Sequence, residues 1–293
     1  MTLTSPGRFE FSPIGSRPDF SWPGSKRLAI HLCLNLEHFS FGEGYGISYS
    51  PGIPHPNTYN WGWREYGNRV GVWRLLDLCA EQQIPVSALV NSELYAHAPE
   101  IMDALRDRGD EIVGHGRTNS EHQNDFDEAG EAAIIREATD IIARHEGRPP
   151  SGWLSPGVNP SAVTTDLLQE AGYTYILDWP IDDQPVWLST RNGGRILQVP
   201  YPQEINDIPF IVLHHGTASD FADAIIENFE EMLRQSGDQP LVFGISIHAF
   251  LMGQPFRIKE FRRALDHINR RRDEIWWATT GQIAEHFARQ VND

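Results

Sequence analysis

Residues 27–36 read RLAIHLCLNL and are followed directly by Glu37 and His38. The apolar side chains of this stretch recur on alternate positions, which predicts a β-strand. Glu37 and His38, the two ionisable residues that follow, lie where we expect the strand to end and a loop to begin. A carboxylate in a dry pocket has a raised pKa and can act as a general base toward water, which makes Glu37 a candidate for that role. The alternative is a charged strand terminus that meets solvent.

Outward from this strand, apolar runs alternate with amphipathic runs along the rest of the chain. The alternation predicts strands separated by helices, and therefore one parallel-stranded α/β domain over residues 1–293. We expect residues 1–26 to form an N-terminal extension and residues 37–68 to form a long irregular loop folded over a site. Further strands are expected at 86–91, 110–114, 152–154, 175–177, 211–213, 242–247 and 274–278.

Polar residues directly follow several of these predicted strands. In barrels of parallel strands the active site gathers at the carboxyl ends of the strands, so we expect these side chains to meet. His115 lies between two glycines, which let the backbone approach a ligand closely. His248 suits a general acid. The strand-end residues are Glu37, Asn91, His115, Ser155, Asp178 and His248.

The overall charge and the N-terminal sequence narrow the range of partners. The formal net charge is −16, from 40 acidic and 24 basic side chains, which disfavours nucleic acid because phosphate binding needs a positive surface. No apolar run approaches the roughly 20 residues that span a bilayer, and residues 1–20 lack an apolar segment of the signal-peptide type. We therefore expect a cytoplasmic protein with neither nucleic acid nor a membrane as partner.

Four common signatures of catalytic or metal sites are missing from the sequence. It contains no glycine-rich phosphate-binding loop and no Gly-x-Ser-x-Gly elbow. It also contains no Cys-x-x-Cys pair and no His-Glu-x-x-His helix. These absences leave the strand-end residues as the candidate site.

Taken together, the strand-end residues resemble the motifs of the NodB-homology polysaccharide deacetylase family over about residues 27–287. Members carry Thr-Phe-Asp-Asp-Gly after the first strand, where the first Asp is the base and the second binds metal. Residues 35–39 read NLEHF here, so Glu37 matches the base and His38 stands at the metal-binding position. The resemblance implies an α/β fold, a deformed (β/α) barrel of the polysaccharide deacetylase (NodB-homology) type.

The remaining family motifs are partly rewritten. The His-Ser/Thr-x-x-His motif reads HGRTN from His115, so Asn119 replaces the second histidine ligand, and residues 154–157 (LSPG) have lost the Arg of Arg-x-Pro-Tyr/Phe. His248 is kept. If a metal binds, the resemblance implies zinc on His38, His115 and Asn119. Because two of these three ligands have changed type, we expect a site without metal or other cofactor.

Two stretches resemble the allantoinase and cyclic imide hydrolase branch of that family, namely YGNRVGVWR at 66–74 and LMGQPFR at 251–257. Enzymes of that branch open ring C–N bonds. The resemblance therefore implies a hydrolase that opens the C–N bond of a small cyclic imide or amide, such as succinimide, maleimide or a hydantoin. An allantoinase, a zinc-dependent deacetylase of polysaccharides or N-acetyl sugars, and a non-catalytic carbohydrate-binding barrel stay open as alternatives.

The resemblance also assigns roles to the candidate residues. Glu37 would deprotonate water, His248 would protonate the leaving nitrogen, and His38 and His115 would orient the water or stabilise the oxyanion. We further expect a homo-oligomer, a dimer or tetramer, with aromatic residues 45–63 as part of a subunit contact. The expected substrate-binding residues are Asn119, Tyr66, Arg69, Trp153, Ser155, Asp178 and Trp179.

Overall fold

The computed structural model describes residues 5–44 and 52–291, which fold around a mainly parallel sheet. Its strands run in the order β6-β7-β5-β4-β3-β2-β1-β8, and β9 pairs with the first residues of β1. A parallel bridge between Asn206 and Ser246 brings the segment after β7 against β8. The strands are β1 Leu28–Leu36, β2 Val86–Val90, β3 Glu111–Gly114, β4 Gly152–Trp153, β5 Tyr175–Ile176, β6 Val186–Ser189, β7 Arg195–Gln198, β8 Leu241–His248 and β9 Ile275–Trp277.

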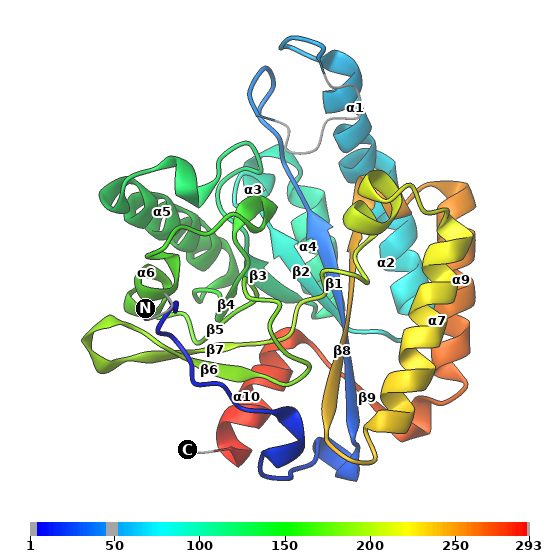
Figure 1. The fold of residues 1–293 in the computed structure, drawn as a ribbon. Coiled ribbons are helices and arrows are strands. Elements are labelled where there is room, and N and C mark those ends of the chain that lie inside the picture. The colour runs from blue at the N-terminus through cyan, green and yellow to red at the C-terminus, as the bar shows by residue number, and fades with distance from the viewer. Residues whose placement is uncertain (1–4, 45–51, 292–293) are drawn as a thin grey trace.

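Helices cover the sheet on both sides, and the chain adopts the predicted deformed (β/α) barrel. In Figure 1, α2, α7 and α9 lie beside β1 and β8, whereas α5 and α6 lie beside β4 and β5. Helix α1 stands beyond the carboxyl end of β1. The helices are α1 Thr58–Tyr66, α2 Val72–Glu81, α3 Leu94–His97, α4 Pro99–Arg108, α5 Glu128–Glu146, α6 Thr164–Glu170, α7 Ala218–Gln235, α8 Ala249–Met252, α9 Pro255–Asn269 and α10 Thr280–Gln290. None of the helices in the described residues is long and apolar enough to cross a membrane.

The register of the strands brings their ends to one edge. Leu36 is paired with Val90 across β1 and β2, and Val90 with Gly114 across β2 and β3. On the other side of β1, Asn35 is paired with His248. The residues that follow these strands therefore emerge at the same end of the barrel, which is where a site was expected.

The strand predicted at 211–213 is wrong. Residues Ile208–Leu213 form a π-helical turn, η7, instead. Pro209 lies in its first turn, where a residue without an amide hydrogen is tolerated, and this local feature outweighed the apolar run. Strands β6 and β7 form an antiparallel hairpin that the βα alternation did not predict.

The expected irregular loop at 37–68 is also partly wrong. Residues 45–51 lie outside the described residues, so the subunit contact expected from 45–63 is not described there. The second half of the segment forms α1, because the side chain of Asn57 caps the helix by accepting the backbone amide of Asn60 at 3.0 Å. A π-helical turn, η3 at Gly67–Gly71, then joins α1 to α2.

Two glycines let this helical segment lie directly on α8. A Cβ on Gly71 would lie 2.1 Å from the carbonyl oxygen of Ala249, and a Cβ on Gly67 would lie 2.6 Å from the backbone nitrogen of Phe250. Both contacts are to backbone atoms, which cannot rotate away. The close approach therefore requires glycine, and it fixes where α1 stands above the strand ends.

We predict that Gly71→Ala lowers the free energy of unfolding by about 1–3 kcal/mol, because the added methyl group must push α8 away. Gly62, within α1, is the matched control, since a Cβ there meets nothing within 4 Å. Gly62→Ala should be neutral or stabilising by up to about 1 kcal/mol through helix propensity. Urea unfolding of both variants measures the difference, and equal stability of the two would contradict the close packing.

Candidate active site

A cavity of about 560 Å³ opens at the carboxyl ends of β1, β3 and β8. Side chains from the strand ends form its floor, and residues from α1, η7 and the loop after β4 form its walls. The lining residues include Asn35, Glu37, Phe39, Arg64, His115, Asn119, His122, Leu154, Asn159, Tyr201, Gln203, Asn206, Leu213, His248 and Phe250.

Glu37 lies at the centre of this arrangement. Its Oε1 is 3.5 Å from Nε2 of His248 and 3.9 Å from Nε2 of His115. All three side chains are buried. Asn35 and Glu37 both line the cavity, as expected from the alternation of side chains along a strand. The sequence-predicted base thus stands between two of the sequence-predicted histidines.

His248 is held by a buried carboxylate behind it. Its Nδ1 donates to Oδ1 of Asp207 at 2.6 Å, and its backbone amide donates to Oδ2 at 2.8 Å. Burial alone would lower the pKa of His248, but Asp207 and Glu37 together raise the pKa to about 9. At neutral pH the ring is therefore a cation whose Nε2–H points toward Glu37 and the cavity. Sequence reasoning missed Asp207, which follows no apolar strand.

The tautomer of His115 is set by the loop after β4. Its Nδ1 donates to the carbonyl oxygen of Leu154 at 2.7 Å, so a neutral ring carries no hydrogen on Nε2. That Nε2 is buried and has no hydrogen-bond partner within the described residues. His115 therefore presents an acceptor to the cavity, suited to a water molecule and not to an oxyanion.

The expected rise of the Glu37 pKa is wrong. Burial does act to raise that pKa, but the positive charge of His248 opposes it most strongly and holds the pKa well below its usual range. Glu37 is consequently a carboxylate beside an imidazolium, the protonation states that a general base and a general acid need at neutral pH.

Asn119 binds the chain just after β1, and the loop after β4 holds His115. The backbone amide of Asn119 donates to the carbonyl oxygen of His38 at 2.8 Å, and its side-chain Oδ1 is buried in the cavity wall without a partner among the described atoms. Asp178 accepts from the backbone amide and the hydroxyl of Ser155, both at 2.7 Å. Burial raises the pKa of Asp178 to about 6 despite these bonds. Ser155 and Asp178 do not line the cavity but brace the loop that carries Leu154.

Several expected site residues lie elsewhere. His38 points to the other side of the β1 end and contacts His97, because adjacent residues of a strand face opposite ways. Trp153 is fully buried under Gly114 and Tyr173, and a Cβ on Gly114 would lie 2.7 Å from its ring. These positions correct the predicted roles of His38 in catalysis and Trp153 in substrate binding.

The remaining predicted substrate-binding residues are likewise outside the cavity lining. Trp179 packs edge-on against Phe9, with ring centroids 6.2 Å apart. Tyr66 accepts a hydrogen bond from Arg74, and Arg69 is exposed on η3. For Tyr66 and Arg69, the resemblance of residues 66–74 gave no information on which way each helical side chain points.

Sequence reasoning missed Arg64, the cation that reaches the cavity from α1. Its guanidinium donates to the backbone and side-chain oxygens of Asn60 and lies 4.4 Å from the centroid of the Phe39 ring. Asn35, His122, Tyr201, Gln203 and Asn206 add polar groups to the same cavity. The capping residue Asn57 could have predicted helix α1 from the sequence. The position of Arg64 at the cavity depends on tertiary packing, which the sequence pattern does not show.

The donors in the cavity do not fit a zinc ion. The expected ligands His38, His115 and Asn119 do not converge, because His38 faces His97. His248 is protonated at neutral pH, with Nδ1 committed to Asp207, and an amide oxygen is a poor zinc ligand. One group in residues 5–44 and 52–291 brings three histidine, cysteine or carboxylate ligand atoms within 4.8 Å of one another. It consists of His38, Glu65 and His97 and does not line the cavity.

Comparison with known proteins finds that this chain is similar to polysaccharide deacetylases. Residues 58–176 match the polysaccharide deacetylase family model. A putative polysaccharide deacetylase of Schizosaccharomyces pombe is 23% identical over 305 residues, covering 94% of this chain and 94% of that protein.

Two solved structures are similar over nearly the whole chain. A probable polysaccharide deacetylase from Pseudomonas aeruginosa is 27% identical with a TM-score of 0.81, covering 94% of this chain and 95% of that one. PuuE allantoinase is 25% identical with a TM-score of 0.84, covering 96% of this chain and 98% of that one. The similarity thus extends beyond the part matched by the family model.

We predict that Asp207→Asn lowers the pKa of His248 from about 9 by roughly 1–3 units, because the opposite charge beside the ring is lost. NMR titration of the ring measures this change, with Asp178→Asn as a control that leaves the His248 pKa in place. Since that pKa is raised, the stability it contributes is full below about pH 6.5 and is lost as the pH rises through about 9. A wild-type ring that titrates near 6.5 would contradict the pairing.

Proposed function

We propose that this chain, which is similar to polysaccharide deacetylases and to PuuE allantoinase, opens the ring C–N bond of a small cyclic imide or amide. The observation that carries the proposal is the buried pair of Glu37 and His248, 3.5 Å apart at the floor of the cavity. Glu37 is an ionised base and His248 is a protonated acid, and both line the same cavity.

In the proposed reaction, Glu37 takes a proton from a water molecule that Nε2 of His115 helps to orient. The water oxygen attacks one ring carbonyl, and the side-chain Nδ2–H of Asn119 is the candidate donor that stabilises the resulting oxyanion. His248 then gives its Nε2 proton to the departing ring nitrogen as the C–N bond breaks. After the reaction Glu37 is protonated and His248 is neutral. Transfer of the proton from Glu37 to His248, by exchange with solvent, restores the carboxylate and the imidazolium.

In the part of the chain that the structure describes, no three zinc-type ligand atoms of the cavity lie within 4.8 Å of one another, and the proposed substrate class agrees with that spacing. The nitrogen of an imide is shared between two carbonyls, so each carbonyl is more electrophilic than that of an ordinary amide. Attack then depends less on a Lewis acid, and oriented donors carry more of the stabilisation. An acetylated amino sugar has an ordinary amide carbonyl and lacks this advantage.

The cavity walls support a small planar ring. Phe39 and Phe250 supply apolar surface, and Arg64 supplies a cation that could hold the second carbonyl oxygen or the carboxylate formed on ring opening. The cavity volume of about 560 Å³ is large enough to take a single ring.

Allantoin is the second candidate substrate. The similarity to PuuE allantoinase over 96% of this chain favours it, as do the amide side chains of Asn35, Gln203 and Asn206 at the cavity. A ureide presents more N–H and C=O groups than succinimide does, and each would need a partner on desolvation.

A panel of substrates tests the proposal. We expect turnover of maleimide, succinimide or allantoin, and none of N-acetylated chitin oligomers. Glu37→Gln should reduce kcat by about 10²–10⁴-fold while leaving the fold intact, because the base is lost but the shape is kept. The control is Glu204→Gln, since Glu204 is exposed and does not line the cavity.

Two results would contradict the proposal. Turnover of chitin oligomers without turnover of any cyclic substrate would exclude ring opening. Near-full activity of Glu37→Gln, with circular dichroism unchanged, would remove Glu37 as the base whatever the substrate is.

A further inference from the structure

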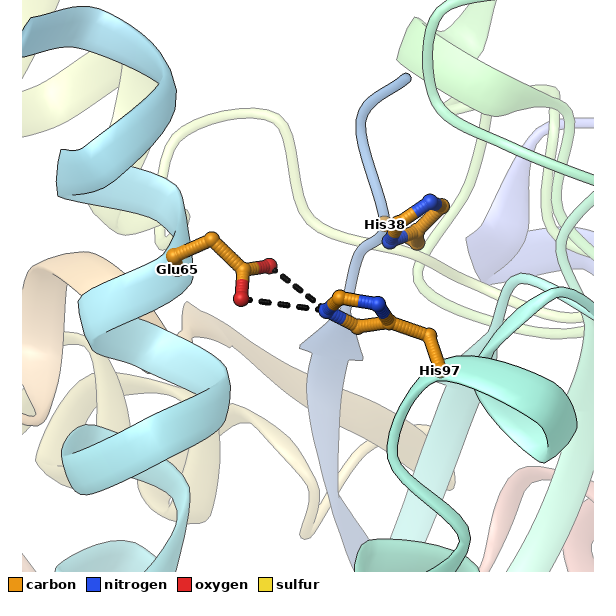
Figure 2. Close-up of side chains that lie close together, drawn as sticks. All are labelled: His38, Glu65 and His97. Carbon is orange, nitrogen blue, oxygen red and sulfur yellow. Dashed lines mark hydrogen bonds and ion pairs between the residues drawn. The ribbon is translucent and has the colours of Figure 1, made fainter. Parts of the chain in front are cut away.

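A second group of ligand-type side chains lies beside the cavity and is not used by the proposed reaction. Figure 2 shows that His38 at the end of β1, Glu65 on α1 and His97 at the end of α3 point toward one another. Nε2 of His97 is 3.0 Å from both carboxylate oxygens of Glu65. The rings of His38 and His97 have centroids 4.3 Å apart. Three distant parts of the chain thus converge on one point.

The environment of His38 points to a missing partner. Its Nδ1 is buried and has no hydrogen-bond partner in the part of the chain that the structure describes. The His38 ring contacts the imidazole of His97, which carries no negative charge and cannot form an ion pair with it. An unsatisfied buried nitrogen costs free energy comparable to a lost hydrogen bond, so a group that binds His38 would remove that cost.

The donor set is one that binds borderline transition-metal ions. One ligand atom from each of His38, Glu65 and His97 can be chosen so that all three lie within 4.8 Å of one another. Zinc binds imidazole nitrogen and carboxylate oxygen at about 2.0–2.2 Å, so small side-chain rotations would bring these atoms around one ion. Two imidazoles and one carboxylate also suit Co²⁺ and Ni²⁺, whereas Mg²⁺ and Ca²⁺ prefer oxygen ligands.

We propose that His38, Glu65 and His97 form a binding site for one divalent transition-metal ion of the zinc class. The ion would take the place of the proton shared between His97 and Glu65 and would keep open positions for water. Ion access is available, since the side chains of His97 and Glu65 are 33% and 13% exposed.

This site is separate from the catalytic cavity, although it shares two chain segments with it. Glu37 lines the cavity while its neighbour His38 faces the other way, and Arg64 lines the cavity while its neighbour Glu65 faces the site. A bound ion would tie α1 to the end of β1 and to α3. Its role is therefore structural: it holds the helix that carries Arg64 in place over the substrate.

A second histidine–carboxylate pair provides the matched control. Nε2 of His267 lies 2.7 Å from Oε1 of Glu230 on the surface, which is the same kind of ion pair as His97 and Glu65. No third ligand joins that pair within the described residues. If the group at His97 were only a surface ion pair, it would behave as the His267 pair does.

The test is a titration of the purified full chain, stripped by chelation, with Zn²⁺ against a chromophoric competitor and with Co²⁺ followed by its visible d–d absorption. We expect one ion per chain, a rise in the thermal-unfolding midpoint on binding, and imidazole-type Co²⁺ spectra. His97→Ala and Glu65→Gln should each weaken binding at least about tenfold. His267→Ala should bind as the wild type does.

Three outcomes would overturn the proposal: no binding, binding unchanged in His97→Ala, or binding lost in His115→Ala and kept in His97→Ala. The last outcome would place the ion in the cavity and would contradict the metal-free reaction as well. Failure of the metal titration alone, with cyclic substrates still turned over, would leave the proposed function standing. The two ideas therefore fail separately.

Discussion

The Glu37 carboxylate, buried between two imidazoles, is the interaction around which the rest of the site is arranged. A buried negative charge is costly unless opposite charge and hydrogen-bond donors face it. His248 meets that need because Asp207 keeps its ring protonated, and the three groups form a buried chain of alternating charge. Removing His248 would leave two buried carboxylates without the cation that lies between them, so the acid–base pair and the stability of the cavity floor depend on the same contacts.

The fold serves this arrangement through backbone contacts that few side chains could replace. The register of β1 with β8 sets Asn35 opposite His248, and the loop after β4 brings the carbonyl of Leu154 to His115. The glycines of η3 let α1 and α2 lie on α8, which brings Arg64 over the cavity. Residues that line the cavity, Glu37 and Arg64, are then each followed by a residue of the proposed metal site, His38 and Glu65.

The sequence predicted the fold and the residues at the centre of the cavity. Polar residues that directly follow apolar strands can be recognised from the sequence alone. Glu37, His115 and His248 each follow a predicted strand, and all three line the cavity. Asp207 and Arg64 were missed, since a side chain reaches the cavity from a loop or a helix only through tertiary packing. His38 was misplaced because the family motif counts positions, whereas the direction of a side chain depends on where the strand ends. Residues 211–213 were wrongly predicted as a strand. An apolar stretch that short shows no periodicity that would distinguish a strand from a helical turn.

The central claim is that the ionised Glu37 and the protonated His248 carry out hydrolysis without a metal in the cavity. The most direct measurement is kcat/KM for a cyclic imide on protein stripped of divalent cations, followed as a function of pH. We predict that turnover persists after stripping and declines on the alkaline side as His248 loses its proton, near its pKa of about 9. Turnover that disappears on stripping and returns with one zinc ion per chain, in a manner that requires His115 and not His97, would contradict it.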